Sequence, residues 1–92
     1  MNIIIKQIEL IERIDQLIRL QATGTPEDFA YRLRISKTKL YRIINTMKTL
    51  KAPIEYDITE QSFVYAEAVG FTFGFYPRHQ KYRKLDPFVG EF

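Results

Sequence analysis

The sequence predicts an α+β fold in which three helices precede a two- or three-stranded antiparallel sheet. Up to residue 50, apolar residues recur at the three- and four-residue spacing of amphipathic helices. After Pro53 the period changes to two, which is typical of strands with one buried face. The chain has 92 residues, a length that corresponds to one domain. We therefore expect one folded domain over residues 1–76, followed by a basic, flexible C-terminal tail over residues 77–92.

The first predicted helix runs from Ile3 to about Leu20. Its apolar residues follow two neighbouring lines, one through Ile4, Ile8, Ile11 and Ile18, the other through Leu10, Ile14 and Leu17. This stripe is wider than the roughly 100° that a helix needs to cover a core. Two interpretations stay open: the helix is deeply embedded in the core, or its spare apolar face pairs with a second copy of the protein.

Two shorter helices follow, each with a clear start. Thr25 is a suitable N-cap for a helix that begins at Pro26 and stops near Leu33. Ser36 is the N-cap expected for a third helix over about residues 37–50. The apolar stripe of that helix consists of Leu40, Ile43, Ile44, Met47 and Leu50. Two helices joined by a short turn, the second with basic residues on its outer face, are typical of a helix-turn-helix.

The alternating segment after Pro53 predicts a β-hairpin and a possible third strand. The alternating apolar residues of the three runs are Ile54, Tyr56 and Ile58, then Phe63 and Tyr65, then Phe71, Phe73 and Phe75. Residues 59–62 form the polar turn of the hairpin. A hairpin directly after a helix-turn-helix makes a winged helix. The three phenylalanines either pack on the first helix or form a subunit interface.

Composition excludes several kinds of chemistry. The chain has no Cys and one His, so it has no disulfide, no Cys-ligated metal and no thiol nucleophile. No glycine-rich phosphate loop and no constellation of nucleophile and base can be assembled. Charged residues interrupt the apolar N-terminus before it could span a membrane. We therefore expect a cytoplasmic protein that is not an enzyme and needs no metal or cofactor.

Positive charge is concentrated in the centre of the chain. Residues 26–51 carry seven basic and two acidic side chains, whereas residues 52–76 carry four acidic and no basic ones. A basic block of this kind favours a polyanionic partner. The basic tail either lies along the same polyanion or only aids solubility.

Residues 24–57 resemble the N-terminal winged helix-turn-helix of DeoR-type and WYL-type bacterial transcriptional regulators. The matching segments are residues 25–33, Ile35-Ser36, Leu40-Tyr41-Arg42 and the more specific Ala52-Pro53-Ile54-Glu55-Tyr56-Asp57. The resemblance implies a transcription factor that binds double-stranded DNA with its third helix in the major groove. Relatives carry an effector-binding domain after the wing, and we expect no small-molecule effector domain in this chain.

The chain departs from the family pattern at four places. Arg34 and Lys51 stand where relatives usually have Gly, so both positions should have positive φ, and each adds a base near the expected phosphates. The resemblance implies that position 43 is exposed and commonly acidic, but here it is Ile43. The wing tip, residues 58–62, is acidic and lacks Gly. We expect that this wing does not contact DNA.

The outer face of the third helix supplies the candidate DNA-binding residues, which are Lys37, Thr38, Lys39, Tyr41, Arg42, Asn45 and Lys48. Arg42 suits paired hydrogen bonds to guanine and Asn45 to adenine, whereas the lysines suit phosphates. Tyr41 either contacts DNA or is wedged between two helices. We expect a homodimer, joined through the first helix or the phenylalanine strand, that presents two such helices. The alternative is a winged-helix interaction module that has lost DNA binding.

Overall fold

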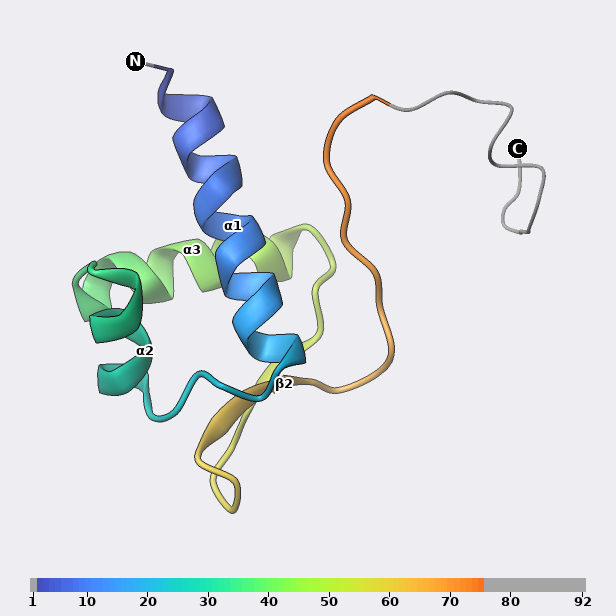
Figure 1. Ribbon diagram of the computed structural model, residues 1–92. Coiled ribbons are helices and arrows are strands. Elements are labelled where there is room, and N and C mark those ends of the chain that lie inside the picture. Colours follow the sequence, from blue (N-terminus) through green and yellow to red (C-terminus); the bar gives the residue numbers. More distant parts are fainter. Residues whose placement is uncertain (1, 76–92) are drawn as a thin grey trace.

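The computed structural model describes residues 2–75 and has the predicted order of elements (Figure 1). The helices are α1 (Ile3–Arg19), α2 (Pro26–Leu33) and α3 (Lys37–Thr49), and the strands are β1 (Ile54–Asp57) and β2 (Ser62–Tyr65). The α+β class with three helices before an antiparallel sheet is therefore confirmed, and this order is compatible with a winged helix. The tail predicted over residues 77–92 lies outside the described residues.

Side-chain caps explain where the three helices begin. Asn2 Oδ1 accepts a hydrogen bond from the Ile4 amide at 2.9 Å. Thr25 and Asp28 form a capping box, in which each side chain accepts from the other residue's backbone amide at 3.2 Å. Ser36 Oγ accepts from the Lys39 amide at 3.0 Å. These bonds satisfy amides that have no partner inside a helix, so the predicted starts at residues 26 and 37 are confirmed.

One apolar core joins the helices to the sheet. Ile14 of α1, Phe29 of α2 and Leu40 of α3 have no exposed surface. The sheet adds Ile54 and Phe63, which are 4% and 5% exposed. The ring centroids of Phe29 and Phe63 lie 5.4 Å apart, so the hairpin packs directly on the helix pair.

The sheet has two strands, paired antiparallel with Ile54 opposite Tyr65 and Tyr56 opposite Phe63. The prediction of a third strand over Phe71–Phe75 is wrong, because this segment has no regular structure. After β2 the chain leaves the hairpin and runs back irregularly (Figure 1). Phe71 lies beside Ile11 of α1, whereas Phe73 is 60% exposed. Alternation of aromatic residues is therefore not sufficient for a strand when no neighbouring strand accepts its hydrogen bonds.

Three burial predictions need correction. Leu50, predicted in the buried stripe, is the C-cap of α3 and is 63% exposed. Ile43 is 4% exposed, as its place in the apolar stripe of α3 predicts, so the exposed position that the resemblance implied is wrong. Deep embedding does not hold for the whole of α1, because Ile3 and Ile4 are 73% and 68% exposed at a helix end that projects beyond the core (Figure 1).

Two polar networks fix the hairpin to the helices. Thr23, fully buried between α1 and α2, accepts a hydrogen bond from the Phe63 amide at 2.8 Å. Its hydroxyl also lies 3.1 Å from that of Ser62, which was predicted in the turn but begins β2. The Tyr65 hydroxyl donates to Asp15 of α1 at 2.6 Å. These contacts position the β1–β2 hairpin relative to α1.

Within residues 2–75, none of the helices has the length and apolar character needed to cross a membrane.

Candidate nucleic-acid interface

The outer surface of α3 holds every residue that the sequence predicts for DNA binding. Its four buried residues are Leu40, Ile43, Ile44 and Met47. The predicted residues Lys37, Thr38, Lys39, Tyr41, Arg42, Asn45 and Lys48 are all exposed. The apolar stripe therefore turns the polar residues outward, as binding in a groove requires.

The centre of this surface is a line of residues spaced by four, three and four positions. At about 100° per residue, Thr38, Arg42 and Asn45 lie on the side of α3 opposite the buried stripe. Thr49 is absent from the predicted site but continues the same line and is exposed. Thr49 lies eleven residues after Thr38, which is about three helical turns. The sequence alone could therefore have placed Thr49 on the same side of the helix.

The remaining residues lie on the two flanks of that line. Lys37, Tyr41 and Lys48 share one flank of α3, and Lys39 lies on the other. Tyr41 is 42% exposed, so it is a surface residue and the wedge interpretation is wrong. Basic residues on both flanks of this central line are the arrangement that the two phosphate backbones of a DNA groove would require.

Lys37 is engaged in an ion pair with α2. Its ammonium lies 2.8 Å from Oε2 of Glu27, and both side chains are substantially exposed. The hydrogen bond from Lys37 lowers the pKa of the Glu27 carboxyl, and the same bond raises the pKa of the Lys37 ammonium. Because water screens this pair, a phosphate can compete with Glu27 for the lysine.

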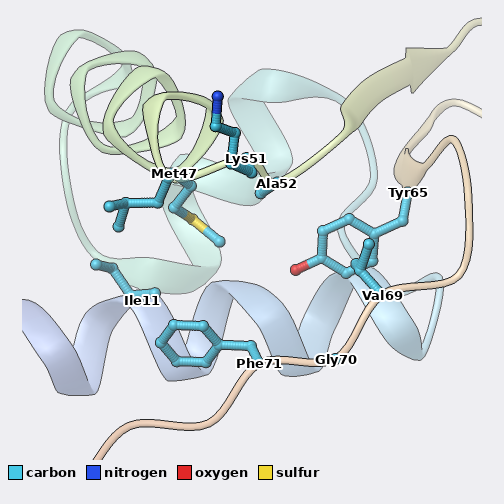
Figure 2. Close-up of a pocket in the computed structure, with 9 residues that line it drawn as sticks. Ile11, Met47, Lys51, Ala52, Tyr65, Val69, Gly70 and Phe71 are labelled. Carbon is cyan, nitrogen blue, oxygen red and sulfur yellow. The ribbon is translucent and has the colours of Figure 1, made fainter. Parts of the chain in front are cut away.

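Arg34 and Lys51, which stand where the resemblance implies glycine, have the predicted backbone conformation. Arg34 has φ 60° and ψ 41° at the end of α2, and Lys51 has φ 79° after α3. Lys51 stands beside an apolar cavity of about 210 Å³ whose lining includes Ile11, Met47 and Phe71. Figure 2 shows the Lys51 amine directed away from these apolar side chains. Lys51 therefore lies just after the C-terminal end of α3, near Ile11 of α1 and far from the N-terminal end of α3.

The wing has the opposite charge. Glu55, Ile58 and Glu60 are exposed on the hairpin, and the Asp57 carboxylate accepts a hydrogen bond from the Glu60 amide at 3.1 Å in the turn. An acidic, exposed wing repels phosphate. The basic surface of α3 is therefore the part of this fold suited to a polyanion.

Comparison with protein-family models, curated proteins and solved structures gives no match. The DeoR/WYL resemblance therefore stays a prediction. Among residues 2–75, no three His, Cys, Asp or Glu side chains gather in a way that could hold a metal ion.

Proposed function

We propose that this protein binds double-stranded DNA sequence-specifically as a small transcriptional regulator, with α3 in the major groove. The observation that carries the proposal is the exposed line of Thr38, Arg42 and Asn45 opposite the core stripe of α3. This helix follows α2 after a turn of three residues, so the pair has the connection of a helix-turn-helix.

The residue types on α3 fit the chemistry of the groove. The major groove admits a helix and presents a distinct pattern of donors and acceptors for each base pair. Arg42 supplies two donors for the guanine edge, and the Asn45 amide supplies a donor and an acceptor for adenine. Lys39 and Lys48, on opposite flanks, bind phosphates and set the position of the helix.

Selection of bound sequences from random duplex DNA tests the proposal. We expect a defined motif, and we expect the Arg42→Ala/Asn45→Ala variant to bind it about 30-fold more weakly or worse, because each lost base contact costs about 1–3 kcal/mol. The matched control is Arg13→Ala/Gln16→Ala, which removes the same kinds of side chain from the exposed face of α1. Circular dichroism verifies that both variants are folded. Equal binding by the two variants would refute the groove assignment.

The acidic wing favours a second candidate, a winged-helix interaction module that has lost DNA binding. Glu55, Glu60 and the 79%-exposed Ile58 lie on a surface that suits a protein partner better than phosphate. This candidate predicts no mobility shift with any duplex at low salt and a discrete oligomer in gel filtration. A shift that responds to Arg42 excludes it.

We also propose that the DNA-binding form is a homodimer in which a second copy covers the N-terminal end of α1. Ile3, Ile4 and Ile5 are 73%, 68% and 52% exposed there, which is unusual for consecutive large apolar residues. A two-fold pair would place two recognition helices about one DNA turn apart, so the selected motif should be palindromic. In sedimentation equilibrium Ile4→Gln should weaken self-association, whereas Glu12→Gln, an exposed change on the same helix, should not. A monomer at all concentrations would refute the dimer.

A further inference from the structure

One side of α2 adjoins the start of the proposed recognition helix. Glu27 and Tyr31 are four residues apart and Arg34 follows three residues later, so the three residues share one side of α2 and its C-terminal end. The ion pair between Glu27 and Lys37 shows that this side faces the first turn of α3. Tyr31 and Arg34 therefore lie beside the end of α3 that would enter the groove.

The surface at this junction has the chemistry of an anion site. At the C-terminal end of α2, just before α3 begins, a hollow is lined by Ala30, Tyr31, Arg32, Arg34 and Ile35. Tyr31 is 84% exposed and Arg34 is exposed, so a phenol hydroxyl and a guanidinium are both available at its rim. A guanidinium binds phosphate oxygens in pairs, and tyrosine hydroxyls donate to phosphates in protein–DNA interfaces.

The backbone of Arg34 holds the side chain at a fixed place at the end of α2. Its φ of 60° belongs to the left-handed region, where glycine is favoured over a residue with a Cβ. Hydrogen bonds on both sides hold this conformation, from the Arg34 amide to the Tyr31 carbonyl at 3.1 Å and from the Ile35 amide to the Ala30 carbonyl at 3.0 Å. A left-handed cap is common at helix ends, so this conformation fixes where the Arg34 side chain begins.

We propose that Tyr31 and Arg34 form a phosphate-binding site for the DNA backbone at the junction of α2 and α3. The site rests on the proposed function, because its ligand is a phosphodiester of the duplex that α3 reads. The site adds a phosphate contact on α2 to the phosphate contacts proposed on α3. It also compensates for the acidic wing, which repels phosphate. Two anchors on different helices fix the angle at which α3 enters the groove.

Arg34→Gly is the decisive variant, because glycine keeps the left-handed conformation while removing the charge. Its control is Lys6→Gln, which removes one positive charge from an exposed position of α1, outside the α2–α3 junction. Affinity for the selected duplex is measured by fluorescence anisotropy between 50 and 200 mM salt. Affinity falls as the salt concentration rises from 50 to 200 mM. A variant that lacks one phosphate contact should lose about 3.5-fold less affinity over this range.

We expect that reduction for Arg34→Gly and none for Lys6→Gln, with both variants melting no lower than the unaltered protein. Tyr31→Phe removes only the hydroxyl and should weaken binding at every salt concentration without changing the slope. The site is refuted if the unaltered protein binds its duplex and Arg34→Gly keeps the full slope, an outcome that leaves the groove assignment of α3 intact. If no duplex binds at all, the proposed function fails as well.

Discussion

Removal of the Tyr65 hydroxyl tests how the wing is held. This hydroxyl donates to Asp15 Oδ1 at 2.6 Å, and Asp15 is only 9% exposed. Arg19 is the other partner of the carboxylate, with Nη2 at 3.0 Å from Oδ1. Tyr65→Phe keeps the ring, over which the Arg19 guanidinium lies 5.0 Å from the centroid. The substitution therefore removes one hydrogen bond and little packing.

The expected cost follows from the charge and burial of the acceptor. A hydrogen bond to a charged group contributes about 1.5–3 kcal/mol. Because Tyr65 is only partly buried and Arg19 remains as a partner, we expect a loss at the lower end, about 1.5 kcal/mol. For a domain of this size that lowers Tm by about 6–12 °C. Thermal and urea unfolding followed by circular dichroism measure both quantities.

The same residue predicts a dependence on alkaline pH. Burial, and then the hydrogen bond to Asp15, raise the pKa of Tyr65 above its ordinary value of 10.0. Because the folded pKa is the higher one, the contribution to stability is complete below about pH 10 and is lost as pH rises toward the folded pKa. Urea unfolding of both proteins from pH 8 to 11 isolates this contribution. Unchanged stability at pH 7 together with identical pH profiles would refute the reasoning.

Three other substitutions test the interface and the fold. Lys37→Gln should flatten the log–log salt slope by about 0.9, because a phosphate can displace the exposed Glu27 carboxylate from this lysine; an unchanged slope in anisotropy titrations would mean that Lys37 contacts no phosphate. Phe29→Ala should cost about 3–5 kcal/mol because Phe29 is fully buried against Phe63, and a shift of less than 1 kcal/mol in urea unfolding would contradict this packing. Thr25→Ala should cost about 1 kcal/mol by removing the cap of α2, to be checked by Tm against Thr46→Ala on exposed α3.

The helices were predictable because their signals are local. Thr25 and Ser36 precede helices that their own side chains cap, and those bonds span only three residues. The left-handed conformations at Arg34 and Lys51 were also predictable, because they close the ends of helices at fixed places. The outward direction of Arg42 and Asn45 followed from the spacing of the buried stripe.

The features that the sequence did not predict depend on contacts between residues that are distant in sequence. Ser62 lies in β2 because its hydroxyl meets Thr23, 39 residues away. The Phe71–Phe75 segment lacks a partner strand among the described residues, which alternation alone cannot reveal. The ion pair of Glu27 with Lys37 spans ten residues and depends on the angle between α2 and α3. Without that angle, the sequence does not indicate that Tyr31 lies near the start of α3.

The most direct test of the central claim is an NMR titration of the labelled protein with its selected duplex. If α3 reads the groove, the amide shifts should be largest at Thr38, Arg42 and Asn45, with a second group at the α2–α3 junction. The acidic tip of the wing should change little. Shifts concentrated on residues 55–62 or on the N-terminal end of α1, with α3 unaffected, would contradict the claim that α3 is the DNA-binding surface.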